Sequence, residues 1–207
     1  MFYNILDTNR KELLPLLAPF KKHYYLAGGT GLALQIGHRK SEDFDFFTSQ
    51  PFSTTDLFDE VQKNLVKHTL VKIQDEENTL TILVDDTIKI SFFYYPYPLL
   101  EPLLQEECLK IASVADIGCM KLSTIVSRAT LKDYVDLYFI LKHVSLKELL
   151  EKSKNKHPTL DTNLTLKSLI YFDDVSTDPI EFLPDHIVSF DQVKIFLTQE
   201  VKQYFKI

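Results

Sequence analysis

Two aspartates carry the strongest indication of chemistry in the sequence, because Asp43 and Asp45 alternate with Phe44 and Phe46. Side chains two residues apart on a β-strand point to the same face, so both carboxylates emerge together while the phenylalanines enter a core. Neighbouring carboxylates repel each other unless a cation neutralises them, and their oxygens suit hard divalent cations. The pair therefore favours a site for Mg²⁺ or Mn²⁺, although a solvated strand face would show the same alternation.

A glycine turn lies upstream of this pair, at Gly28, Gly29 and Thr30, between an apolar strand over 24–27 and a helix over 31–36. Glycine permits a tight turn, and the N-terminus of the following helix presents unpaired N–H groups and a partial positive charge. The two glycines and the Thr30 hydroxyl are thus suited to holding an anion such as a triphosphate. A plain tight turn is the alternative, and the aspartates downstream favour the phosphate site.

A third group of polar residues lies in two predicted helices of the second half. Lys121, Thr124 and Arg128 share one helix face, which predicts either a cationic stripe that meets a triphosphate or a solvated helix edge. Asp136 lies within an apolar helix, where a carboxylate needs a partner or stays protonated. We expect Lys121 or Arg128 to be that partner, and a purely structural ion pair is an open alternative.

Together, these segments resemble the nucleotidyltransferase superfamily in the form seen in the AbiEii/AbiGii toxin family. The resemblance covers roughly residues 24–141. It lies in the strand, the GG-T turn and helix, Arg39, Ser41, the Asp43-x-Asp45 pair, the segment KLSTIVSR over 121–128 and the segment KDYVDLY over 132–138. It implies a metal-dependent enzyme that transfers a nucleoside monophosphate from an NTP to an acceptor, with the tRNA 3′ end as acceptor and a cognate antitoxin as partner.

The resemblance also implies roles for individual residues. The metal ligands would be Asp43 and Asp45, with Mg²⁺ or Mn²⁺ as the cofactor. The catalytic residues would be Asp43, Asp45, Lys121 and Asp136. The residues that contact the nucleotide would be Gly28, Gly29, Thr30, Arg39, Ser41, Lys121, Arg128 and Asp133.

One position departs from the family pattern. Such sites commonly have a third carboxylate on a later strand, where this chain has Ser91. The departure puts a two-metal arrangement in doubt, while one metal held by Asp43, Asp45 and the substrate phosphates would still serve. It also leaves open a catalytically impaired module that binds a nucleotide or a partner, and an enzyme that modifies a protein hydroxyl.

An RNA acceptor would need a local basic surface, because the whole chain of 207 residues has a net charge of −6. A lysine-rich helix offers one candidate, although such a helix is often merely solvated. Its basic residues are Lys152, Lys154, Lys156 and His157.

The composition fits a cytoplasmic protein that does not contact a membrane. Hydrophobic residues make up 45% of the sequence, enough for a sizeable core, without a run long enough to cross a bilayer or a signal-peptide pattern. Cys108 and Cys119 are the only cysteines, too few for a disulfide framework.

The predicted fold is α+β, a nucleotidyltransferase-like mixed sheet with flanking helices plus a C-terminal helical region. Strands are predicted over 24–27, 43–48, 68–74, 79–84, 87–95 and 109–112. Helices are predicted over 7–20, 31–36, 54–66, 114–127, 131–143, 148–156 and 164–172 and near the C-terminus. We expect residues 1–112 to form an α/β core and residues 113–207 to complete the active-site cleft.

Overall fold

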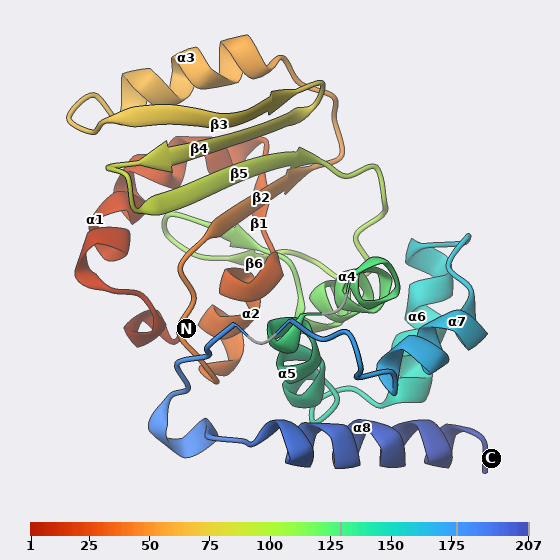
Figure 1. Ribbon diagram of the computed structural model, residues 1–207. Coiled ribbons are helices and arrows are strands. Elements are labelled where there is room, and N and C mark those ends of the chain that lie inside the picture. Colours follow the sequence, from red (N-terminus) through yellow and green to blue (C-terminus); the bar gives the residue numbers. More distant parts are fainter. Residues whose placement is uncertain (129, 177, 207) are drawn as a thin grey trace.

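The computed structural model describes residues 1–128, 130–176 and 178–206. Its centre is a seven-stranded sheet in the order β3-β4-β5-β2-β1-β7-β6 (Figure 1). Strands β2 and β5 pair in parallel, as do β1 and β7, and the other neighbours are antiparallel. The mixed sheet and the α+β class are therefore confirmed. The strands are β1 (Tyr25–Leu26), β2 (Phe44–Thr48), β3 (Leu70–Glu76), β4 (Thr79–Val84), β5 (Ile88–Tyr94), β6 (Leu104–Gln105) and β7 (Lys110–Ile111).

Each predicted helix is present, with ends shifted by a few residues. The helices are α1 (Thr8–Leu17), α2 (Gly28–Ile36), α3 (Thr54–Asn64), α4 (Val114–Ser127), α5 (Leu131–Ile140), α6 (Leu146–Lys156), α7 (Thr162–Leu169) and α8 (Phe190–Tyr204). Seven of them begin at a side chain that accepts a hydrogen bond from the third helical N–H, which satisfies a donor left unpaired by the helix. These caps are Asp7, Ser53, Ser113, Thr130, Ser145, Asp161 and Ser189. Within the described residues, no helix is both long and apolar enough to span a membrane.

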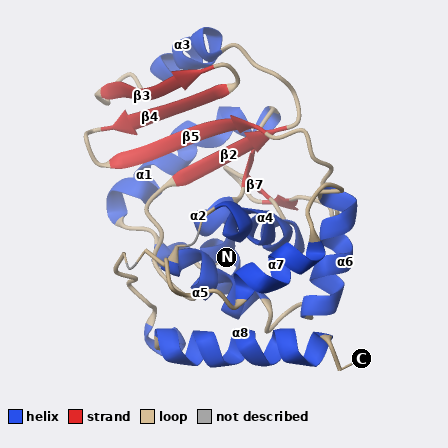
Figure 2. Cartoon of the chain, turned by 45° about the vertical axis from the view of Figure 1, so that its right-hand side comes forward, coloured by secondary structure: helices blue, strands red, loops and turns tan. Residues whose placement is uncertain are grey.

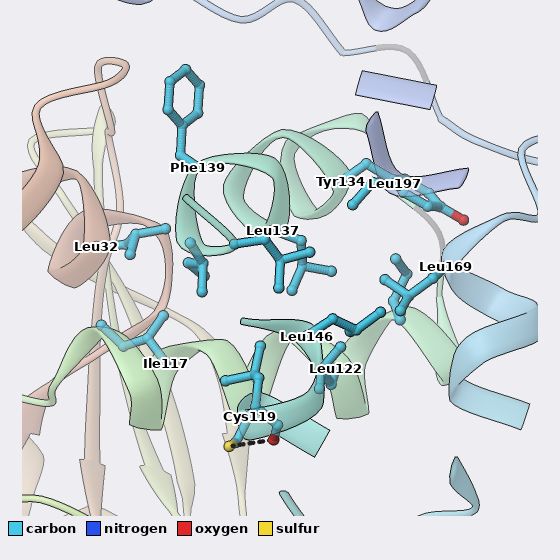
Figure 3. Close-up of a cluster of buried hydrophobic side chains, with 14 of the residues drawn as sticks. Leu32, Ile117, Cys119, Leu122, Tyr134, Leu137, Phe139, Leu146, Leu169 and Leu197 are labelled. Atoms are coloured by element: carbon cyan, nitrogen blue, oxygen red, sulfur yellow. Dashed lines mark hydrogen bonds between the residues drawn. The ribbon is translucent and has the colours of Figure 1, made fainter. Parts of the chain in front are cut away.

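Two hydrophobic cores hold these elements together. The first lies between one face of the sheet and helices α1 and α3, and it contains Phe44 and Phe46 of β2. The second lies among α2 and α4 to α8 (Figure 2), and Leu137 of α5 lies near the middle of the cluster that Figure 3 draws. The other face of β2, which carries Asp45, is therefore left to form a cleft beside the helices.

Helix α2 contributes to both cores. Ala33 and Leu34 belong to the core under the sheet, whereas Leu32 and Ile36 belong to the helical core. Since one helix joins the two parts, the division at residue 112 stays a prediction about folding units.

We expect Leu137→Ala to lower the free energy of unfolding by about 2–5 kcal/mol, because it removes a fully buried side chain and leaves a cavity. Urea unfolding would measure the change. The control is Ile195→Ala on α8, where the side chain is 59% exposed and the expected change is within about 0.5 kcal/mol. Equal effects of the two substitutions would contradict the assigned core.

Candidate active site

A cleft of about 1460 Å³ lies between the open face of the sheet and helices α2 and α4. Its floor comes from β2, β4 and β5, and its walls include the first turn of α2 and one side of α4. The structure brings all but one of the predicted site residues to this cleft. They are Gly28, Gly29, Thr30, Arg39, Ser41, Asp43, Asp45, Lys121, Arg128 and Asp133, and Asp136 lies buried behind them.

The two aspartates emerge on the cleft floor as their spacing predicts. Asp45 is the second residue of β2, and Asp43 lies just before the strand begins. Phe44, between the two aspartates, is fully buried on the opposite face. The Asp43 carboxylate lies 2.8 Å from Nζ of Lys89 on β5. Burial raises the pKa of Asp45, and the negative charge of Asp43 raises it further. A bound cation would relieve this crowding of negative charge.

These donors fit a magnesium ion that takes its other ligands from substrate and water. Within the described residues, no cluster of three or more His, Cys, Asp or Glu side chains is arranged to enclose a metal. Mg²⁺ characteristically uses one or two carboxylates together with phosphate oxygens and waters. Two carboxylates at the edge of an open cleft match that pattern better than a closed protein cage.

The first turn of α2 lies directly beside Asp45. Gly28 has φ +63°, and a β-carbon there would lie 2.8 Å from Oδ2 of Asp45. At Gly29 a β-carbon would lie 2.5 Å from Nη2 of Arg39. The first helical bond runs from the N–H of Gly31 to the carbonyl of Ala27, so the three preceding N–H groups are left at the helix end. The two glycines therefore allow a bare helix N-terminus to approach the carboxylates.

The Thr30 hydroxyl has a different position from the one expected. It is buried, donates to the carbonyl of Asp43 and lies 2.7 Å from the Ser41 hydroxyl. These contacts fix the segment that leads into β2. Contact of Thr30 with a triphosphate stays a prediction, for which its backbone N–H is better placed than its hydroxyl.

A buried charge cluster lies behind the cleft around Asp136, which is 0% exposed. Arg39 donates to both carboxylate oxygens, from Nε at 2.8 Å and Nη2 at 2.9 Å. Lys121 Nζ lies 2.7 Å away, and the neutral ring of His38 donates from Nε2 at 2.8 Å. Burial alone would raise the pKa of Asp136, but Arg39 and Lys121 hold it well below its usual range. Asp136 is therefore ionised.

The expected partner Lys121 is confirmed, and Arg128 is not a partner of Asp136. The Arg128 side chain is 70% exposed and lies 4.0 Å from Asp133. Sequence reasoning missed Arg39 and His38 as partners because Arg39 precedes Asp136 by 97 residues. The sequence feature that could have indicated further partners is Asp136 itself, because a carboxylate in so apolar a helix can require more positive charge than one lysine supplies.

Lys121 connects this cluster to the cleft. Its Nζ lies 2.7 Å from Asp133 as well as from Asp136, and Asp133 also accepts a 2.6 Å bond from the Thr130 hydroxyl. Burial would lower the pKa of Lys121, but the two carboxylates raise it, so the amine stays protonated. Lys121 and Arg128 also counter the rise in the pKa of Asp45. Their positive charges therefore act on the Asp43–Asp45 pair.

Comparison with known proteins identifies the family. The sequence model described as "Nucleotidyl transferase AbiEii toxin, Type IV TA system" matches residues 16–194. This chain belongs to the AbiEii nucleotidyltransferase toxin family. An uncharacterized protein of Aquifex aeolicus (strain VF5) is 39% identical over 189 residues, which cover 88% of each chain.

Solved structures of two other proteins have a similar fold. A putative nucleotidyltransferase from H. pylori superposes with a TM-score of 0.59 at 18% identity, covering 97% of this chain and 96% of that one. The nucleotidyltransferase toxin MenT4 from Mycobacterium tuberculosis H37Rv gives a TM-score of 0.65 at 14% identity, covering 93% and 80%. At such low identities these likenesses show the fold.

Ser91 of this AbiEii-family chain lies directly beside Asp45. The parallel register of β2 and β5 sets Asp45 opposite Ser91, and Ser91 is set opposite Thr81 of β4. The Ser91 and Thr81 hydroxyls are 3.4 Å apart, and Thr81 lies 3.4 Å from Gln74 on β3. A row of neutral polar groups thus extends from Asp45 across the floor, where a third carboxylate was expected.

The predicted basic surface on α6 is wrong for two of its four residues. Lys156 is 0% exposed and forms an ion pair of 2.8 Å with the buried Asp116. His157 is 4% exposed and its Nε2 lies 2.9 Å from the hydroxyl of Tyr95. Lys152 is paired with Glu101, which leaves Lys154 on the exposed side. At the end of α6 these two side chains lie in the interior, where Asp116 pairs with Lys156 and the Tyr95 hydroxyl contacts His157.

We expect Asp136→Ala to lower the free energy of unfolding by about 3–5 kcal/mol, because it strands Arg39 and Lys121 in the interior. Urea unfolding of the purified protein measures this. Asp191→Ala is the control, since its carboxylate pairs with Lys194 on the exposed side of α8 and should contribute no more than about 1 kcal/mol. Equal decreases in the free energy of unfolding in the two variants would contradict a stabilising role of the Asp136 cluster.

Proposed function

We propose that this AbiEii-family protein is a Mg²⁺-dependent nucleotidyltransferase that moves a nucleoside monophosphate from an NTP to the 3′ end of tRNA. One observation carries the proposal: the Asp43–Asp45 pair faces the bare N-terminus of α2 inside one cleft. The helix end supplies N–H donors for phosphates, and the carboxylates supply oxygen ligands for the metal. Both parts of a metal–triphosphate complex thus find their partners within a few ångströms.

In this mechanism the chain binds and orients the reactants. The N–H groups of Gly28 and Gly29 hold the triphosphate, and Asp43 and Asp45 hold the metal. When bound, Mg²⁺ neutralises negative charge on the phosphates during transfer. Water takes up the proton of the acceptor hydroxyl, whose oxygen bonds to the α-phosphorus. The bond from this phosphorus to the oxygen that bridges the α- and β-phosphates breaks, so pyrophosphate leaves. Such chemistry depends on positioning and electrostatics more than on covalent groups.

The positive charge opposite the carboxylates is held in place by the buried cluster. Lys121 keeps its proton between Asp133 and Asp136, and Arg39 is fixed by Asp136 from the other side. Lys121 would therefore meet the phosphates in a fixed orientation, with no conformational change needed. This preorganisation supports transfer over mere binding.

An RNA acceptor is supported by cations that remain around the cleft. Lys40, Lys89, Arg128 and Lys132 line it among acidic residues, and Lys40 pairs with Glu181 while Lys89 pairs with Asp43. The largely exposed Arg128 side chain would contact phosphates of an RNA end. The family assignment to type IV toxin–antitoxin systems supports a cognate antitoxin as the protein partner.

The deciding experiment incubates purified protein with Mg²⁺, each labelled NTP in turn and total bacterial tRNA. We expect label on intact tRNA and none on tRNA whose 3′-terminal diol has been oxidised by periodate. Label on protein instead of RNA would favour the protein-hydroxyl alternative. Measurable NTP binding without any transfer would favour a binding module and would overturn the transferase proposal.

We expect Asp43→Asn and Asp45→Asn each to abolish transfer while leaving the fold intact, because each removes a metal ligand at the open cleft. Isothermal titration of MgATP and thermal unfolding would be measured on the same samples. Glu42→Gln is the matched control, since its exposed side chain lies beside Asp43 in sequence. Metal-dependent NTP binding that persists in the double variant would refute the site.

We expect Ser91→Asp to tighten Mn²⁺ or Mg²⁺ binding, because the new carboxylate would stand beside Asp45 across the β2–β5 register. The transfer rate would change in the same variant. Val66→Asp, where the side chain just after α3 is 75% exposed and does not line the cleft, is the control for adding an acid elsewhere. Identical metal affinity of wild type and Ser91→Asp would contradict the placement of the metal.

A further inference from the structure

The floor of the cleft becomes aromatic two residues beyond the metal pair. Phe47 follows Asp45 on β2, Phe93 follows Ser91 on β5, and the register of the two strands sets Phe47 opposite Phe93. The two ring centroids are 5.4 Å apart, and Tyr95 meets Phe47 edge-on at 5.5 Å. We call Phe47, Phe93 and Tyr95 the aromatic shelf. All three rings are half-buried and line the cleft.

The cleft therefore has two chemically different parts. Around Asp45 it is charged, with Lys89 and Lys121 close by, whereas two residues further along β2 and β5 its floor is formed by the rings of the shelf. A nucleotide has the same two parts, a charged phosphate and a flat base with an apolar face. Two residues of strand advance by about 6.6 Å, a span comparable to the ribose that separates phosphate from base.

Buried polar contacts hold the shelf in a fixed geometry. The Tyr95 hydroxyl is hydrogen-bonded to Nε2 of His157 at 2.9 Å, and Tyr97 packs edge-on against Tyr95 with centroids 4.8 Å apart. Burial and, to a smaller extent, the adjacent Lys156 lower the pKa of His157 to about 4, so the ring is neutral at pH 7. Lys156 in turn is held by Asp116 at 2.8 Å.

This arrangement gives the buried end of α6 a role toward the cleft. Lys156 Nζ also donates to the carbonyl of Pro98 at 2.7 Å, which fixes the chain that leaves β5 just after Tyr95. A rigid aromatic surface binds a flat ligand at a lower entropic cost than a mobile one. His157 and Lys156 are thus positioning residues for Tyr95 and not a surface for RNA phosphates.

We propose that the aromatic shelf is a nucleobase-stacking subsite of the cleft. The inference rests on the proposed function, since it assumes that a nucleotide occupies the metal site. The base belongs either to the incoming NTP or to the terminal nucleotide of an RNA acceptor, because both place a base one ribose away from the reacting phosphate. Stacking on aromatic rings tolerates all four bases, so the shelf contributes affinity more than base selectivity.

The test variant is Phe93→Ala, because Phe93 is half-exposed and its ring contacts Phe47 at the edge of the shelf. Phe93→Tyr keeps a stacking ring, Phe93→Leu keeps the apolar volume without one, and Phe205→Ala removes a 67% exposed phenylalanine far from the cleft. Thermal unfolding establishes that each variant is folded. Isothermal titration with Mg²⁺ compares an NTP with inorganic tripolyphosphate, which has no base.

If the NTP base occupies the shelf, Phe93→Ala weakens NTP binding at least about fivefold and leaves tripolyphosphate binding unchanged. If the acceptor base occupies it, NTP binding is unchanged and a fluorescent single-stranded RNA binds at least about fivefold more weakly. In both cases Phe93→Tyr and Phe205→Ala behave as wild type, and Phe93→Leu is impaired.

Unchanged binding of both NTP and RNA in Phe93→Ala would overturn the inference. Equal weakening of NTP binding and tripolyphosphate binding would also overturn it, because the substitution would then act on the phosphate-binding part of the cleft and not on a base. Because the measurements are of binding, they do not depend on turnover. If the protein transfers nucleotide and Phe93→Ala has no effect, the proposed function holds and the nucleobase subsite is wrong. If Phe93→Ala weakens base-dependent binding but no transfer occurs, the subsite holds and the proposed transferase function is wrong.

Discussion

The carboxylate of Asp136 shares the protein interior with Arg39 and Lys121, and burying three charges is costly unless every one is paired. Here each has its partner at 2.7–2.9 Å, and His38 adds a fourth contact. The residues come from three places in the chain: the segment after α2, helix α4 and helix α5. This cluster therefore fixes how the helices stand beside the sheet, and with it the width of the cleft.

The same constraint determines the electrostatics of the site. Two aspartates, Asp133 and Asp136, offset the charges of Lys121 and Arg39 behind the cleft. Asp43 and Asp45 face the cleft, and the pKa of Asp45 is raised by burial and by Asp43 although nearby cations counter the rise. The positive charges of Lys121 and Arg39 are complementary to the phosphates of a metal–triphosphate complex, and the Asp43–Asp45 pair is complementary to its metal ion. The fold supplies this complementarity before any ligand binds, which is the condition for electrostatic catalysis.

A second buried ion pair works on a smaller scale. Asp116 and Lys156 are both fully buried, and through the carbonyl of Pro98 they fix the chain that follows β5. Tyr95 and His157 are ordered as a result. The two buried pairs act on different parts of the cleft: the Asp136 cluster orients Lys121 on the phosphate side, and the Asp116–Lys156 pair fixes the segment that carries Tyr95 on the aromatic side.

The sequence by itself determined the local features of this protein. Alternation of Asp43 and Asp45 with phenylalanines, the glycine turn and the periodicity of the helices predicted the site, the α+β class and the family, because each depends on neighbours a few residues apart. Tertiary structure alone decided which charges meet. The pairing of Asp136 with Arg39, of Asp116 with Lys156, and the inward turn of His157 join distant segments, and a buried charge takes whichever partner the packed chain brings within reach.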